Sequence, residues 1–161
     1  MSLVIRPARP GEAGLVLTLV RELAVYEKLE HEVVASEAMM NDLLFGPNPR
    51  VFCDIAEWDG APAGLTLWYY GFSSFEGRLG IYLEDLYVRE NLRAKGIGTA
   101  LIARLARRCV DENLARFEWS VLDWNTPSID FYKAMGAELM DGWTVCRVSG
   151  TALKALAERG A

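Results

Sequence analysis

The expected fold is decided by the run Leu79-Gly80-Ile81-Tyr82-Leu83-Glu84-Asp85-Leu86-Tyr87-Val88 and, shortly after it, Arg93-Ala94-Lys95-Gly96-Ile97-Gly98-Thr99. The first run consists of β-forming residues with near-alternating apolar character, which predicts a strand. From Ile97 to Val110 apolar residues recur at helical spacing, which predicts a helix to about Asn113. A short basic turn with two glycines therefore joins a strand to a helix.

This basic turn has the composition of an anion site. Gly96 and Gly98 allow the backbone to bend sharply and to approach a ligand closely. The free N–H groups and the positive dipole end of the following helix attract an anion, and Arg93 and Lys95 add cationic donors. A phosphate or pyrophosphate is the expected ligand. The alternative from these residues alone is a basic turn without function.

Composition and charge restrict the class of protein. A chain of 161 residues, of which 52% are hydrophobic and 24% charged, predicts one domain over residues 1–161 with a substantial core. The net charge of −5 argues against nucleic-acid binding by bulk attraction and is compatible with a cationic small substrate. No signal peptide and no apolar run of membrane-spanning length are visible, so we expect a cytoplasmic protein without a membrane partner.

The cysteines and the histidine predict neither disulfides nor a metal site. Cys53, Cys109 and Cys146 are odd in number and lie in apolar patterns, which indicates buried thiols in a reducing compartment. His31 is the only histidine, and no Cys-x-x-Cys pair exists, so we expect no zinc.

The remaining patterns complete the order β-α-α-β-β-β-α-β-α-β-β. A helix separates strand 79–88 from the next strand, so these two strands are expected to be parallel neighbours. The other expected strands cover residues 3–6, 51–56, 63–72, 117–122, 137–140 and 143–148, and the other expected helices cover residues 10–26, 37–44, 126–135 and 151–159.

Arg-x-x-Gly-x-Gly between a strand and a helix, here Arg93 to Gly98, resembles the acyl-CoA-binding signature of the GNAT superfamily of N-acetyltransferases. The predicted order of elements matches that fold over essentially the full length. The resemblance implies an α/β fold of mixed α+β character. Its twisted central sheet is mostly antiparallel with one splayed parallel strand pair, and helices lie on both faces.

Four short runs resemble the diamine acetyltransferase group of this superfamily, which contains spermidine/spermine acetyltransferases and thialysine acetyltransferases. The resemblance implies an acetyl-CoA-dependent enzyme that acetylates a primary amine of a small cationic substrate by direct attack, and a homodimer. The loop Ser73–Arg78 departs from the polyamine-acetylating pattern, which favours a thialysine-like or short diamine substrate. The four runs are Tyr26-Glu27, Tyr82-Leu83-Glu84-Asp85, Val121-Leu122-Asp123-Trp124-Asn125 and Phe131-Tyr132-Lys133.

The resemblance places the cofactor along the splayed strand pair and the glycine turn. Pantetheine is expected to bond the backbone of Leu86, Tyr87 and Val88, because buried backbone groups without partners are costly. The pyrophosphate is expected at the amides of the turn, and two polar residues at the start of the next helix are expected to bond the cofactor. The turn residues are Arg93, Ala94, Lys95, Gly96, Ile97, Gly98 and Thr99, and the two polar residues are Asn125 and Ser128.

Amine acetylation also needs a carboxylate near the amine, since an alkylamine with a pKa of ~10.4 is a cation at neutral pH. Strand alternation places Glu84 and Asp85 on opposite faces, unless a bulge intervenes. The resemblance assigns Glu84 both to substrate binding and to catalysis, where it helps to deprotonate the amine directly or through water, and adds Tyr26 and Glu27 as substrate contacts. Asp85 is expected to have a structural hydrogen-bonding role.

Tyr132 is expected to protonate the departing thiolate. Phe131 has no polar atom and is expected in the core of a short helix, so that Tyr132 points elsewhere. A phenol is a suitable acid for a thiolate, and the family places its general acid at this tyrosine. The alternative is a surface tyrosine with a loosely held hydroxyl.

Two other functions remain open at this point. A protein or peptide N-acetyltransferase would need an open groove, which the acidic run Glu27–Glu32 disfavours weakly. A non-catalytic acyl-CoA-binding domain is disfavoured by the retention of Glu84 and Tyr132 together with the intact glycine turn.

Overall fold

The structure is a computed structural model that describes residues 1–160. The chain divides into two compact units, of which the first is Met1–Ser120 and the second begins at Val121. Each unit is described by itself. One domain over the whole chain stays a prediction.

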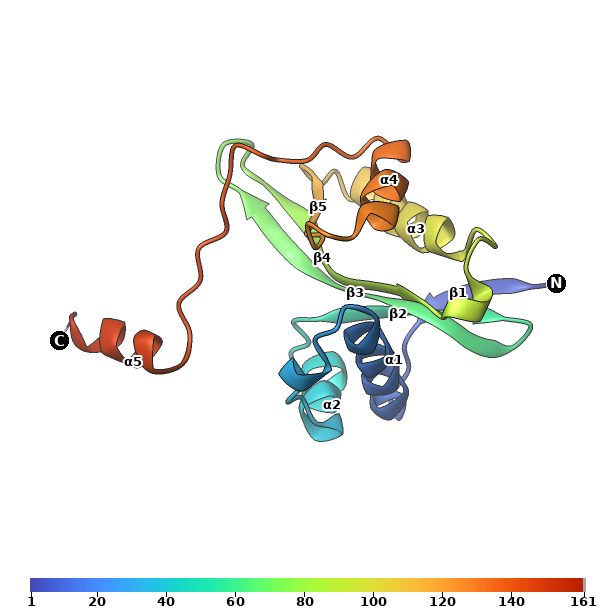
Figure 1. Cartoon of the computed structure of the whole chain (residues 1–161), viewed down its shortest axis with the longest axis horizontal. Coiled ribbons are helices and arrows are strands. Elements are labelled where there is room, and N and C mark those ends of the chain that lie inside the picture. The colour runs from blue at the N-terminus through green and yellow to red at the C-terminus, as the bar shows by residue number, and fades with distance from the viewer. Residues whose placement is uncertain (161) are drawn as a thin grey trace. The chain divides into compact units, whose positions relative to one another are not determined.

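A twisted five-stranded sheet forms the centre of the first unit (Figure 1). Three neighbouring strand pairs are antiparallel, whereas β4 and β5 are parallel. This confirms a mixed fold whose sheet is mostly antiparallel with one parallel pair. In spatial order the strands are β1 (Leu3–Pro7), β2 (Phe52–Trp58), β3 (Ala61–Ser73), β4 (Arg78–Val88) and β5 (Phe117–Trp119).

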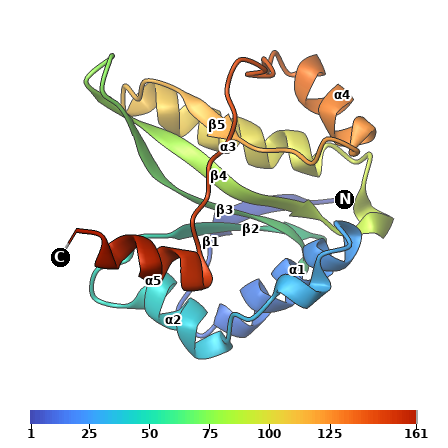
Figure 2. The same ribbon diagram turned by 60° about the vertical axis from the view of Figure 1, so that its left-hand side comes forward.

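Helices cover both faces of this sheet, as Figures 1 and 2 show. The helices α1 (Ala13–Tyr26) and α2 (Glu37–Phe45) lie on one face, and α3 (Ile97–Asp111) lies on the other. Single 3-10 turns, η1 (Glu30–Glu32) and η2 (Glu90–Leu92), stand in the connections. The expected helices on both faces are therefore present.

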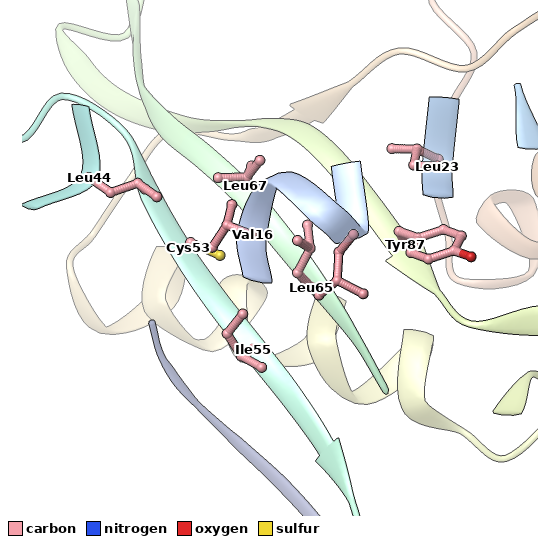
Figure 3. Packing of buried hydrophobic residues seen from close by; sticks show 9 residues of the cluster. Val16, Leu23, Leu44, Cys53, Ile55, Leu65, Leu67 and Tyr87 are labelled. Atoms are coloured by element: carbon pink, nitrogen blue, oxygen red, sulfur yellow. The ribbon is translucent and has the colours of Figure 1, made fainter. Parts of the chain in front are cut away.

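Each face of the sheet has its own hydrophobic core. On the α1 side, Val16 and Leu23 pack against Leu65, Leu67 and residues of neighbouring strands (Figure 3). On the α3 side the helix contributes a stripe of buried residues at helical spacing, namely Ile97, Leu101 and Leu105. An apolar strand residue packs into either the α1-side or the α3-side core, and this shows to which face of the sheet its side chain points.

The parallel pair is short and closely packed. Its register runs from Ile81 opposite Phe117 to Leu83 opposite Trp119, whereas β4 continues to Val88. Gly80 permits the close approach, because a Cβ there would lie 2.6 Å from a carbonyl oxygen of the partner segment. Beyond Leu83, no strand of the first unit pairs with the β5 side of β4.

The second unit contains α4 (Thr126–Ala134) and α5 (Gly150–Glu158) but no strand in its described residues. The strands predicted at 137–140 and 143–148 are therefore wrong. A β-forming sequence is stabilised by packing and pairing with a neighbouring strand, and the described part of this unit offers none. Trp143 and Val145 are both 81% exposed as a result.

The end of β5 and the burial of two cysteines also differ from the expected structure. β5 ends at Trp119 instead of residue 122. Cys53 is buried as expected, but Cys109 is only half-buried and Cys146 is exposed, because it lies in the segment that forms no strand. No helix among residues 1–160 is both long and apolar enough to cross a membrane.

Candidate active site

The turn between β4 and α3 has the backbone of an anion site. Ala94 and Gly96 have positive φ angles of 60° and 79°, and Gly96 is the N-cap residue of α3. No side chain caps this helix, so the first-turn N–H groups keep their donor capacity. Of the two glycines in the turn, Gly96 has the left-handed conformation, whereas Gly98 already lies within the helix.

Arg93 connects this turn to the end of α1. Its Nε donates a hydrogen bond of 3.1 Å to the carbonyl oxygen of Val88. Its guanidinium lies 4.5 Å from the ring centre of Tyr26 and 6.0 Å from that of Tyr87, within cation–π range. Arg93, which is expected at the cofactor, thus contacts Tyr26, which is expected at the substrate.

A β-bulge in β4 brings two adjacent carboxylates to one face of the sheet. Asp85 lies opposite Leu67 and Leu83 opposite Trp68, so Glu84 is the extra residue without a partner on β3. Leu83 and Leu86 both pack into the α3-side cores. The two residues between them therefore both project to the α1 side, so the bulge that strand alternation left open is present and Glu84 and Asp85 share one face.

The two carboxylates differ in their surroundings. Glu84 is exposed, whereas Asp85 is half-buried. Burial, Glu84 and Glu27 together raise the pKa of Asp85 to about 7, and no hydrogen bond or cation among residues 1–160 counters them. The expected structural hydrogen-bonding role of Asp85 is therefore wrong.

Glu27 brings the end of α1 into the same group. It follows Tyr26 as the C-cap residue of α1 and is half-buried, and this burial raises the pKa of its carboxyl. Its effect on Asp85 shows that the two carboxylates are close enough to interact. Glu27 and Glu84, two of the predicted substrate residues, thus lie close to Asp85, and Tyr26 precedes Glu27 at the end of α1.

A hollow of about 260 Å³ lies on the same face of the sheet, towards the far end of β3 and β4. Glu84 lies near it, because its charge helps raise the pKa of Tyr69, after the larger effect of burial. The rings of Tyr69 and Tyr82 are 5.3 Å apart, and the Tyr82 hydroxyl lies 2.7 Å from the Ser120 hydroxyl. The lining residues are Tyr69, Gly71, Phe72, Ser73, Gly80, Ile81, Tyr82, Arg116 and Glu118.

The remaining predicted site residues lie in the second unit and are described within it alone. Asn125 is buried and caps α4, where its Oδ1 accepts a 3.3 Å hydrogen bond from the backbone N–H of Ser128. Tyr132 is 9% exposed, with its ring 5.5 Å from that of the half-buried Phe131. The expectation that Phe131 is the core residue of the pair and Tyr132 points elsewhere is therefore wrong.

Two residues of this region were missed by sequence reasoning. Strand alternation without a bulge places Asp85 on the face opposite Glu84, and Tyr69 lies within the strand expected over residues 63–72 without a predicted role. The adjacency of Glu84 and Asp85 was the available signal, but the bulge that aligns them depends on the register with β3.

Among residues 1–160, no three His, Cys, Asp or Glu side chains are placed to hold a metal ion.

Comparisons with known proteins agree with this geometry. The model of the acetyltransferase (GNAT) family matches residues 17–137. Thialysine N-epsilon-acetyltransferase of Sus scrofa is 39% identical, with 97% of this chain and 98% of that protein covered. L-ornithine N5-acetyltransferase of Arabidopsis thaliana is 30% identical, with 94% and 86% covered.

A solved structure adds a match in three dimensions. An integron cassette protein from the mobile metagenome of V. cholerae superposes with a TM-score of 0.80 at 27% identity, covering 98% of this chain and 99% of that one. The family match spans most of the chain, and both curated relatives are covered over more than two thirds of their length. The protein therefore belongs to the GNAT family of acetyltransferases and is an N-acetyltransferase.

Proposed function

We propose that the enzyme transfers an acetyl group from acetyl-CoA to a primary amine of a small cationic substrate, with a thialysine-like amino acid preferred over a polyamine. One observation carries this proposal. A chain 39% identical to a thialysine acetyltransferase places Glu27, Glu84 and Asp85 on one face of its sheet, around the end of α1. Carboxylates grouped without a cation of the protein suit a ligand that supplies the positive charge.

The proposed cofactor site uses backbone groups of the first unit. Past Leu83, β4 has no strand partner on its β5 side within this unit, so Leu86, Tyr87 and Val88 are available to the pantetheine arm. The uncapped N-terminus of α3 and the bend at Gly96 support pyrophosphate binding along Arg93–Thr99. Asn125 and Ser128 of α4 are proposed as further cofactor contacts.

The proposed substrate contacts are Tyr26, Glu27 and Glu84. The exposed carboxylate of Glu84 attracts the cationic substrate, and the neighbouring hollow of about 260 Å³ suits a small molecule. Tyr132 is proposed as the general acid that protonates the departing thiolate sulfur. A homodimer belongs to the same proposal, and the exposed apolar residues Trp143, Val145 and Val148 are a candidate surface for it.

An amine panel tests this function. Thiol release from acetyl-CoA is measured with thialysine, ornithine, spermine, a short peptide, and the matched pair 1,4-diaminobutane and butylamine, which differ by one distal ammonium. We expect thialysine to give the highest kcat/KM, diaminobutane to exceed butylamine by about tenfold or more, and spermine to be poor. Release with the peptide alone would instead assign a peptide N-acetyltransferase, and spermine ranking first would contradict the substrate preference.

A further inference from the structure

The hollow on the α1-side face of the sheet is lined by one cation and one anion, Arg116 and Glu118. Phe117 and Trp119 pack into the α3-side core, so the residues that alternate with them project towards the hollow. Nε of Arg116 lies 2.7 Å from a carboxylate oxygen of Glu118, and both side chains are about half-exposed. Neither has another charged partner among residues 1–160. The hollow therefore presents both signs of charge side by side to a ligand.

The strands beneath the hollow leave room for that ligand. Gly71 on β3 lies opposite Gly80 on β4, and both residues line the hollow. A Cβ at Gly71 would meet no atom within 4 Å, so the space above this strand is open. The next residue pair on the same face, Tyr69 and Tyr82, places two rings 5.3 Å apart at the side of this space. These rings are suitable contacts for methylene groups or a thioether.

The hollow is also in line with the proposed site of acetyl transfer. On the α1-side face of β4, Gly80 and Tyr82 line the hollow, Glu84 follows at the bulge, and Leu86–Val88 are the residues proposed for pantetheine. Since a strand advances about 3.3 Å per residue, Tyr82 and Glu84 lie about 7 Å apart along β4, which is comparable to the length of a lysine-like side chain. A substrate that lies along β4 thus has its reacting amine towards the cofactor and its other end in the hollow.

We propose that Arg116 and Glu118 bind the charged head group of an amino-acid substrate, with Arg116 at its α-carboxylate and Glu118 at its α-ammonium. The inference rests on the proposed function and names the residues that select an amino acid over a diamine. A guanidinium binds a carboxylate through charge-assisted hydrogen bonds, and a carboxylate does the same for an ammonium. A diamine has no carboxylate, so Arg116 only repels its distal ammonium, which adds selectivity against it.

The test compares two substrates that differ by one carboxylate, thialysine and its decarboxylated analogue bis(2-aminoethyl) sulfide. We expect Arg116→Gln to lower kcat/KM for thialysine by about tenfold and to raise it for the diamine, because a carboxylate contact and a repulsion are both lost. Glu118→Gln should lower kcat/KM for both substrates, since both carry the distal ammonium. The matched control is Arg107→Gln on α3, which removes one exposed cation away from the hollow and should change neither value by more than about twofold.

A further variant fills the hollow and keeps both charges. Gly71→Val places its side chain in the open space above β3. It should raise KM for thialysine severalfold and leave KM for ethylamine, which is too short to reach the hollow, close to the wild-type value. An unchanged KM for thialysine in folded Gly71→Val overturns the proposal even if Arg116→Gln does not fold.

The other outcomes separate this inference from the proposed function. An unchanged ratio of the two kcat/KM values in folded Arg116→Gln overturns the assignment, and so do equal losses for both substrates, because a purely structural role does not distinguish them. A wild type that prefers the diamine to thialysine overturns it as well, with the acetyltransferase intact. Absence of acetyl transfer from wild type to every amine overturns the proposed function itself.

Discussion

Two aspartates of the sheet, Asp54 on β2 and Asp85 on β4, show how neighbouring charges separate a carboxylate that is paired with a cation from one that faces other carboxylates. Asp54 is 4% exposed on the α3 side, and its Oδ1 lies 3.3 Å from Nε of Arg104 on α3. Asp85 is on the α1 side, and its charged neighbours are carboxylates. The protein supplies a cation to Asp54 and leaves the charge of Asp85 for a ligand to balance.

The comparison indicates that burial alone does not identify a functional carboxylate. A buried carboxylate that is ion-paired contributes to the fold, and removal of one partner leaves the other charge uncompensated. A half-buried carboxylate that faces only like charges is destabilising when ionised, and a cationic substrate relieves that cost. The two aspartates therefore differ in whether a cation of the described residues balances their charge.

The largest predicted effect concerns Tyr132, the proton donor in the proposal. Tyr132→Phe removes one oxygen and keeps the aromatic ring of this buried α4 residue. We expect kcat to fall by about 10²–10⁴-fold with both substrates still bound, because the proton is needed only as the thiolate leaves. A loss confined to acetyl-CoA affinity would make Tyr132 a cofactor contact.

The next effect tests the structural aspartate. Asp54→Asn leaves the half-exposed Arg104 without its carboxylate and should lower the free energy of unfolding by about 1–3 kcal/mol, which is a fall of several degrees in Tm. Chemical denaturation of wild type and variant measures the change. An unchanged free energy of unfolding would show that the pair with Arg104 does not stabilise the fold.

The stability of the protein should also depend on pH through Asp85. The folded state raises the pKa of Asp85 from 3.8 to about 7, so the carboxyl holds its proton more tightly when folded. Its stabilising contribution is complete below pH 3.8, and it is lost as pH rises to about 7. Asp85→Asn lacks this dependence and should gain roughly 4 kcal/mol relative to wild type between pH 4 and 8. Parallel stability curves for the two proteins would contradict the raised pKa.

The smallest effect is expected at the exposed carboxylate. Glu84→Gln keeps the shape of the side chain and removes its charge, so KM for a cationic amine should rise by about 3- to 10-fold. Acetyl-CoA affinity should stay within twofold of wild type, and butylamine should be affected less than 1,4-diaminobutane. Equal losses for both amines would show that Glu84 does not recognise the distal charge.

The sequence alone determined those features that depend on local chemistry. Alternation over 79–88, helical spacing after Ile97 and the glycine turn predicted β4, α3 and the bend between them, and the structure contains all three. The side chains of Ser36 and Asn125 cap α2 and α4, because a cap needs only residues close in sequence. The order of elements is correct as far as α4 for the same reason.

Only the tertiary structure decided features that depend on distant partners. The register of β3 against β4 creates the bulge, and the bulge places Asp85 beside Glu84 and Glu27. The segment 137–148 has a strand-like sequence, yet it forms no strand because the described part of its unit contains no other strand. A side chain's direction along a strand, and the existence of a strand itself, are fixed by the neighbouring strand, which local sequence does not specify.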